Sequence, residues 1–217
     1  MQRYFSEIPD SCFRVPSTKS LFTDKCLITF ADETDLSSGL LDLKIFSLVS
    51  PSMCTANIRI GKINKKATIR LGVTNSEIEL GNNISGHWFI ASHQNSKIRI
   101  GDDTSANNGV DIAVKVLAEP DSSVDFGKDC MFSDGITIQC GGQHSIICLK
   151  NREILTHKIS SIRIEDHCWV GRDATLVSSS KEILVGAGSI IATRAVVTKS
   201  VPNCCIAAGK INGVRLD

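Results

Sequence analysis

The sequence predicts an all-β fold, a parallel β-helix in which short strands stack as successive coils. Three observations predict it. Aliphatic residues return at every sixth position through the last quarter of the chain, a shorter six-residue series precedes them, and an Ile-x-Ile-Gly-like phrase recurs further upstream. One inward aliphatic side chain per six residues is typical of coils that bury their inner face only by stacking on their neighbours.

The first part of the chain lacks any repeat. It contains Pro9, Pro16 and Pro51 together with serine-rich stretches. Because the open end of a solenoid must be covered, residues 1–55 are expected to form an N-terminal cap or an irregular first layer. Residues 56–217 are expected to form the β-helix as a single domain.

The upstream phrase alternates aliphatic and charged residues and ends in glycine, which predicts a strand followed by a turn. The glycine suits a corner with a positive backbone dihedral angle, or one where two coils approach closely. The copies of the phrase are Ile58–Gly61, Ile69–Gly72, Ile78–Gly81 and Ile98–Gly101.

A strict six-residue series runs through Phe126, Phe132 and Ile138, so the next inward position falls on His144. The apolar requirement stops there, and residues 145–161 do not keep the period. His144 is therefore expected where a coil ends or opens, and residues 145–161 are expected to form one protruding loop. Long inserts on a rigid scaffold often carry function.

The last quarter of the chain resumes the strict period in two series separated by a surface bulge near residues 178–181. Small or polar residues fill the positions between the aliphatic ones, which suits short strands joined by tight corners. The two series are Ile164, Val170 and Leu176, and then Val185, Ile191 and Val197.

Composition limits the classes of function. With 217 residues, 42% of them hydrophobic, and a formal net charge of +1, the chain can bury a sizeable core and carries no bulk-charge signal for nucleic acid. No apolar run approaches the roughly 20 residues of a membrane span, and no secretory signal is visible. Nine cysteines without a Cys-x-x-Cys pair predict neither a disulfide framework nor a zinc site. A reducing cytoplasm and no bound metal are expected.

Several segments together resemble the hexapeptide-repeat acyltransferases, and among them the sugar and polysaccharide O-acetyltransferases. The resemblance covers residues 126–217 well and residues 58–125 only as loose repeats. The matching segments are Gly141–Ile146 (GGQHSI), Ile162–Gly171 (IRIEDHCWVG), Val196–Pro202 (VVTKSVP) and Ala208–Gly209.

The resemblance implies a left-handed parallel β-helix, a homotrimer, and acetyl-CoA bound as co-substrate in the groove between neighbouring subunits. It implies an O-acetyltransferase acting on a carbohydrate, such as a capsular polysaccharide, a lipopolysaccharide or a sugar precursor. The handedness comes from the resemblance alone, since the usual crossover preference is right-handed.

The family's catalytic histidine falls on His144. Acyl transfer to a hydroxyl requires a group that takes the proton of the attacking oxygen, and histidine is the natural general base near neutral pH. A histidine that merely ends a coil at the surface is the alternative interpretation.

Trp169 matches a tryptophan that the resemblance places against the acetyl-CoA arm or the acceptor. Because Trp169 precedes the inward Val170, it should point outward, where it could equally cover a subunit interface. The resemblance assigns further cofactor contacts to Gly171, Thr193, Thr198 and Lys199, with Arg215 a possible phosphate partner beside Lys199. Each of these residues could equally be solvated surface.

Two departures from the family pattern stand out. Relatives often carry an aspartate two residues before the catalytic histidine, where this chain has Gly142. The group that orients the imidazole is therefore missing or comes from elsewhere, with Asp134 a candidate by its proximity in the sequence. The terminal Gly-Asn-Pro-Ala of relatives is replaced by Gly209–Asn212 (GKIN).

Three other functions stay open at this point. An amino-sugar N-acetyltransferase would use the same base and groove. A γ-type carbonic anhydrase would need three histidine ligands, but the five histidines (His87, His93, His144, His157 and His167) do not recur at ligand-like spacing. The third alternative is a non-catalytic β-helix that serves as an interaction module. A serine acetyltransferase is disfavoured because no long helical N-terminal domain precedes the coils.

Overall fold

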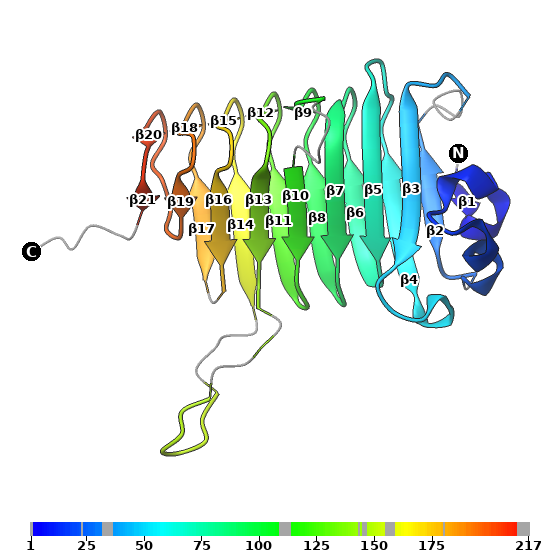
Figure 1. Cartoon of the computed structure of the whole chain (residues 1–217), viewed down its shortest axis with the longest axis horizontal. Helices are drawn as coiled ribbons and strands as arrows, with labels where there is room; N and C mark the ends of the chain where they lie inside the picture. The colour runs from blue at the N-terminus through cyan, green and yellow to red at the C-terminus, as the bar shows by residue number, and fades with distance from the viewer. Residues whose placement is uncertain are drawn as a thin grey trace, which may run out of the picture.

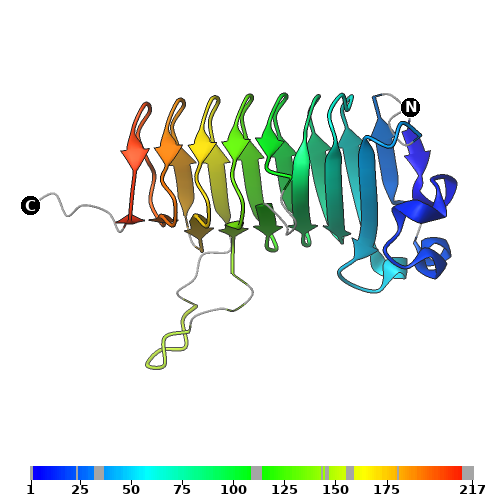
Figure 2. The ribbon, with the colours of Figure 1, turned by 45° about the horizontal axis from the view of Figure 1, so that its top comes forward.

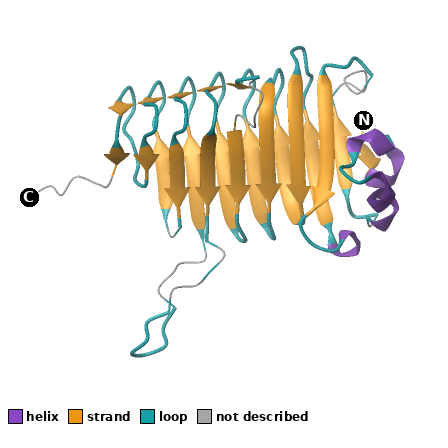
Figure 3. Cartoon of the chain, viewed as in Figure 1, coloured by secondary structure: helices purple, strands orange, loops and turns teal. Residues whose placement is uncertain are grey.

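The computed structural model describes residues 2–22, 24–31, 37–108, 114–142, 144, 147–154, 159–179 and 181–211. Nearly all of its regular structure is β, and the helices drawn in Figure 3 are short 3-10 turns near the N-terminal end. These turns are η1 (Phe5–Glu7), η2 (Asp10–Cys12), η3 (Pro16–Leu21) and η5 (Pro51–Met53).

Three sheets form the long faces of a prism (Figures 1 and 2); sheets A and B run along the whole stack, and the shorter sheet C begins only at Ser105. Within the described residues, sheet A consists of β1 (Gln2–Tyr4), β2 (Leu27–Phe30), β4 (Thr55–Ile60), β6 (Asn75–Leu80), β8 (Ser96–Ile100), β11 (Ser122–Phe126), β14 (Ser160–Ile164) and β17 (Glu182–Val185). Sheet B consists of β3 (Leu41–Ser47), β5 (Ala67–Val73), β7 (Gly86–Ser92), β10 (Val114–Ala118), β13 (Ile136–Cys140), β16 (Thr175–Ser178), β19 (Val196–Val197) and β21 (Lys210–Ile211). Sheet C consists of β9 (Ser105–Ala106), β12 (Met131–Phe132), β15 (Trp169–Val170), β18 (Ile190–Ile191) and β20 (Ile206–Ala207).

Each complete coil passes from sheet A to sheet C, then to sheet B, and turns back to sheet A. The coils wind in the left-handed sense, and neighbouring coils pair in parallel (Figure 1). The predicted fold class, a left-handed parallel β-helix, is confirmed. Among the strands of the described residues, β1 alone pairs antiparallel, against β2, and the loop hairpin adds an isolated antiparallel bridge between Ile147 and Ile154.

The stack of coils begins before residue 56, where the sequence predicted the start of the β-helix. Strand β2 pairs in parallel with β4, and β3 pairs in parallel with β5, so both belong to the stack. The covering part is shorter and consists of β1 and the segment from η1 to η3, where the Phe5 and Phe13 rings pack edge-on with their centroids 6.0 Å apart. The described part of residues 1–55 therefore comprises a short cap and the first strands of the β-helix.

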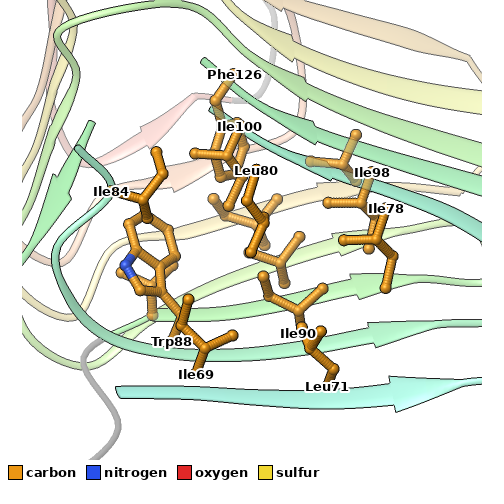
Figure 4. Packing of buried hydrophobic residues seen from close by; sticks show 14 of the residues in the cluster. Ile69, Leu71, Ile78, Leu80, Ile84, Trp88, Ile90, Ile98, Ile100 and Phe126 are labelled. Carbon is orange, nitrogen blue, oxygen red and sulfur yellow. The ribbon is translucent and has the colours of Figure 1, made fainter. Parts of the chain in front are cut away.

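Inward aliphatic side chains form rows along the interior. Phe126, Ile164 and Val185 are register partners on successive strands of sheet A, and all three are buried. The predicted six-residue series are likewise buried at every aliphatic position. Figure 4 shows Trp88 among Ile69, Ile84 and neighbouring side chains, and its indole nitrogen donates to the Ser85 carbonyl at 2.8 Å. Burial of each such aliphatic side chain contributes about 1.5–3 kcal/mol.

The glycines that end the upstream phrase allow close approach between coils. A Cβ built on Gly61 would lie 2.5 Å from the Gly81 carbonyl carbon, and one built on Gly101 would lie 2.4 Å from the Gly127 carbonyl oxygen. No atom fits at such distances, so these corners require glycine. Gly72 differs from the prediction, because β5 continues through it to Val73 and the residue lies inside a strand.

Candidate active site

His144 follows β13 at the corner where the chain turns from sheet B toward sheet A. Strand β13 ends at Cys140, and the His144 side chain is exposed to solvent. The inward series that runs through Ile138 therefore ends as predicted, and the chain leaves the prism at this corner. An exposed imidazole at the root of a protruding loop is accessible to a bound substrate.

A buried carboxylate lies beneath this corner. Gly141 has a φ of +90°, and a Cβ built on it would lie 2.7 Å from the Cβ of Glu119 on the preceding coil. The Glu119 backbone N–H donates to the Cys140 carbonyl at 2.8 Å. Glu119 Oε2 lies 3.9 Å from His93 Nε2, one coil further back, and the Glu119 side chain is only 4% exposed. Glu119 is a candidate that the sequence pattern did not reveal.

The protruding loop extends away from the prism below β13 and β14 (Figures 1 and 2). Its described tip is a small hairpin, in which the Cys148 N–H donates to the Glu153 carbonyl at 2.8 Å. The loop rejoins sheet A at Ser160, so Ser160 and Ser161 of the expected loop 145–161 belong to β14. Apolar side chains on the loop are exposed, namely Ile147, Leu149, Ile154 and Ile159.

Trp169 lies on the outer face of sheet C, as its place before the buried Val170 predicted. It pairs in register with Met131 on one side and with Ile190 on the other, and Ile190 pairs with Ile206. Met131 is 56% exposed, Trp169 45% and Ile206 72%. These four residues form an apolar row along the outside of sheet C, which we call the sheet C row.

Gly171 and Thr193 lie on successive coils at the corner from sheet C to sheet B. A Cβ built on Gly171 would lie 2.7 Å from the Thr193 backbone nitrogen. Close coil stacking is therefore sufficient reason for the glycine, and its place in a cofactor groove stays a prediction. The Thr193 side chain is exposed.

Thr198 and Lys199 follow β19 and lie at the corner from sheet B to sheet A, the same corner that carries His144 two coils earlier. Thr198 is half-buried and Lys199 is exposed. Arg215, the remaining predicted phosphate partner, lies outside the described residues.

One chain does not bring His144 and Trp169 together. In a three-sided coil, the face opposite the corner between sheets B and A is sheet C, which carries Trp169. Figure 1 shows β15 on one side of the prism and the protruding loop on the other. The predicted site residues therefore fall into two groups, with His144, Thr198 and Lys199 at one corner and Trp169, Gly171 and Thr193 on and beside the opposite face.

Asp134 does not supply the missing orienting group. It lies at the corner from sheet C to sheet B, where its Oδ2 accepts hydrogen bonds from Asn107 Nδ2 at 2.8 Å and Arg172 Nη2 at 3.0 Å. That corner is distinct from the one that carries His144. Through these two hydrogen bonds, Asp134 links neighbouring coils.

Most cysteines of the coils are buried, whereas Cys204 is exposed at a corner of the last coil. All nine are free, and Cys130, Cys140 and Cys168 are buried as predicted. Burial raises the pKa of the Cys12, Cys54 and Cys140 thiols. A buried thiol with a raised pKa is a poor nucleophile. Within the described part of the chain, no group of three or more His, Cys, Asp or Glu side chains could hold a metal ion.

Comparisons with known proteins bear on the fold. No family model and no curated protein sequence matches the chain. The chain is similar to the crystal structure of the polySia-specific acetyltransferase NeuO, with 22% identity, 84% of this chain and 77% of that chain covered, and a TM-score of 0.64. It also matches the polysialic acid O-acetyltransferase OatWY at 21% identity, with coverage of 83% and 81% and a TM-score of 0.49.

The likeness to NeuO shows a shared fold. At this level of identity, residue roles do not carry over, because function depends on particular side chains placed on a fold. Among the described residues, no helix is long and apolar enough to cross a membrane.

Proposed function

We propose that this protein is an acetyl-CoA-dependent O-acetyltransferase that transfers acetyl to a hydroxyl of a carbohydrate, with His144 as general base. The observation that carries the proposal is the placement of His144, an exposed imidazole where the coil opens into the protruding loop. The shared fold with the acetyltransferase NeuO adds to it.

The proposed active enzyme is a homotrimer with its sites between subunits. Two exposed apolar surfaces lie on opposite sides of each chain, namely the sheet C row and the protruding loop with Leu149 and Ile159. Surfaces that differ from each other and lie on opposite sides suit head-to-tail contacts, which close into a ring when the rotation allows it. Such a ring would bring His144 of one subunit toward Trp169 of the next.

Acetyl-CoA would supply the acetyl group as a thioester. Lys199 is an exposed cation suited to its phosphates, and Trp169 and Thr193 offer contacts on the facing subunit. His144 would take the proton from the acceptor hydroxyl as that oxygen attacks the thioester carbonyl carbon. When the tetrahedral intermediate breaks its carbon–sulfur bond, the His144 imidazolium would return the proton to the departing thiolate.

Relatives often carry an aspartate at the position of Gly142, and Glu119 is our candidate for the acidic group that takes its place. Its carboxylate is buried one coil below the root of the His144 segment, next to Gly141. A carboxylate there would favour the imidazolium form of a nearby histidine. In the described structure it already pairs with His93, so its effect on His144 requires a direct test through the pH dependence of kcat/KM in the Glu119→Gln variant.

The proposed reaction belongs in a reducing compartment such as the cytoplasm. All nine cysteines are free, including the exposed Cys204. Free thiols persist in cells where glutathione and thioredoxin keep them reduced. An acceptor met there would be a sugar precursor or a growing polysaccharide.

The experiment that tests the function is acetyl transfer to a panel of neutral, amino and carboxylated sugars, measured by mass spectrometry of the products. The parent protein should form an acetyl ester, and His144→Ala should lower kcat/KM by about 100-fold or more. His167→Ala is the matched control, because His167 is also exposed but lies at the corner between sheets A and C, paired with Asp129 at 2.8 Å. An unimpaired His144→Ala variant, or transfer confined to amines, would contradict the proposal.

A further inference from the structure

A groove of about 380 Å³ lies on the outer face of sheet B, near the N-terminal end of the stack. Its lining combines three cations with two aromatic rings, and none of these residues belongs to the two groups at the candidate active site. The lining residues are Arg14, Lys44, Phe46, Arg70 and Phe89.

The strands of the first coils place these side chains together. Inward Leu43 and Ile45 alternate with outward Lys44 and Phe46 on β3, and Arg70 on β5 is the register partner of both Lys44 and Phe89. Arg14 comes from the cap, where its backbone N–H donates to the Ile45 carbonyl at 2.9 Å. The cap therefore adds one cation to the edge of sheet B.

The aromatic floor depends on Gly72. The Phe46 and Phe89 ring centroids lie 5.8 Å apart at an interplanar angle of 35°. A Cβ built on Gly72 would lie 2.8 Å from the Phe46 ring, so a side chain at this position would displace the ring. Glycine within a strand often marks a place where another group approaches closely, and here that group is the Phe46 ring.

Lys44 and Arg14 retain donor capacity, whereas Arg70 is engaged within the protein. Arg70 is held by Asp42, through a bond from Nη2 to Oδ2 of 2.7 Å. Lys44 Nζ donates to the Ser11 carbonyl and has two further hydrogens. The Arg14 guanidinium stands over the Phe46 ring at 5.5 Å from its centroid, and the described residues offer it no ion-pair partner. The groove is thus cationic even with Asp42 beside it.

We propose that this groove binds a carboxylated sugar unit of the acceptor polymer, and the proposal rests on the proposed carbohydrate acetylation. A sugar ring presents an apolar face that can lie on aromatic rings. A carboxylate on the same ring matches the fork of a guanidinium. The two tilted phenylalanine rings, with Arg14 over Phe46 and Lys44 in the same lining, offer both features at once.

The groove is in line with the candidate active site. Phe89 on β7 pairs in register with Lys115 on β10, which pairs with Thr137 on β13, the strand that leads to His144. Two strand spacings separate β7 from β13, roughly 10 Å along the stack. A polymer lying along the outer face of sheet B can therefore occupy the groove with one unit while another unit reaches the His144 corner.

The test measures binding separately from turnover. Titration calorimetry on the full-length protein should show binding of sialic acid oligomers and no binding of neutral malto-oligosaccharides. Arg14→Gln should weaken that binding about tenfold, and Phe89→Ala should weaken it as well, with the melting temperature checked for both. Lys97→Gln is the matched control, because it removes an exposed cation from the outer face of sheet A.

Acetyl transfer then tests the link to the active site. For long carboxylated acceptors, Arg14→Gln should raise KM about tenfold and leave kcat unchanged, while short acceptors should show no difference. Binding that Arg14→Gln leaves unchanged, or equal binding of neutral oligomers, would overturn the proposal. So would binding of inorganic polyphosphate without binding of the carboxylated oligomers. If the oligomers bind as expected but no acetyl transfer is found, the proposed acetyltransferase activity is contradicted and the proposed binding site is still supported.

Discussion

The Thr193 backbone nitrogen on one coil lies 2.7 Å from the point where Gly171 of the preceding coil would carry a Cβ. At the same corner, the Gly171 N–H donates to the Ile191 carbonyl at 2.8 Å. Both contacts show that Gly171 lets two coils meet, whatever else the residue does.

The first prediction concerns stability. Gly171→Ala should destabilise the protein by about 1–3 kcal/mol, because the new methyl group would push neighbouring coils apart. Chemical denaturation measures the loss. Gly142→Ala is the control, since the nearest atom to its new Cβ would be the His144 carbonyl oxygen at 3.8 Å. If Gly171→Ala kept full stability and only raised KM for acetyl-CoA, the cofactor role would replace the stacking role.

The second prediction concerns acid stability. The Asn82 backbone N–H holds the pKa of Asp102 below its usual value of 3.8, and the Arg70 guanidinium does the same for Asp42. Because both folded-state pKa values are lowered, these carboxylates stabilise the fold above pH 3.8. The stabilisation is lost as pH falls through the folded values.

The measurement is urea denaturation across a pH series. The Asp42→Asn/Asp102→Asn variant should lose about 1 kcal/mol or less at neutral pH, since both groups are partly exposed and screened. Its unfolding free energy should also fall less steeply in acid, so that the parent and the variant converge at low pH. Asp24→Asn, a change at an exposed residue, serves as the control. A constant difference at every pH would contradict the assignment.

The third prediction concerns association. If the sheet C row is covered by a second copy, Met131→Asp should bury an unpaired carboxylate there and weaken assembly by about 100-fold or more. Sedimentation velocity should show a trimer for the parent and smaller species for the variant. Ser123→Asp places the same charge on the outer face of sheet A and should leave the trimer intact. If the parent protein sediments as a monomer, the proposed subunit interface is contradicted.

Much of the fold is predictable from the sequence, because inward positions recur at a fixed period. Val170 and Leu176 follow Ile164 at six-residue steps, and each is buried on successive faces of one coil. The sequence did not place β3 in the stack, because Leu41, Leu43 and Ile45 alternate at a spacing of two residues. Such alternation predicts a strand but does not show which neighbours it pairs with.

The candidate site is less predictable. The break in the period at His144 is visible in the sequence, and so is the outward direction of Trp169. That the two lie on opposite sides of one chain follows only from the order of the three faces. Glu119 was missed because it meets Gly141 and His93 across coils of unequal length, so no fixed spacing connects the three residues.

The most direct test of the central claim is complementation between two inactive chains. His144→Ala and Trp169→Ala proteins should each lose most of their activity as homotrimers. When the two chains are refolded together in equal amounts, random assortment should leave about a quarter of the interfaces with both residues intact. The mixture should then regain about that share of the parent kcat. Mixed trimers verified by native mass spectrometry that remain inactive would show that His144 and Trp169 do not share a site across the subunit boundary.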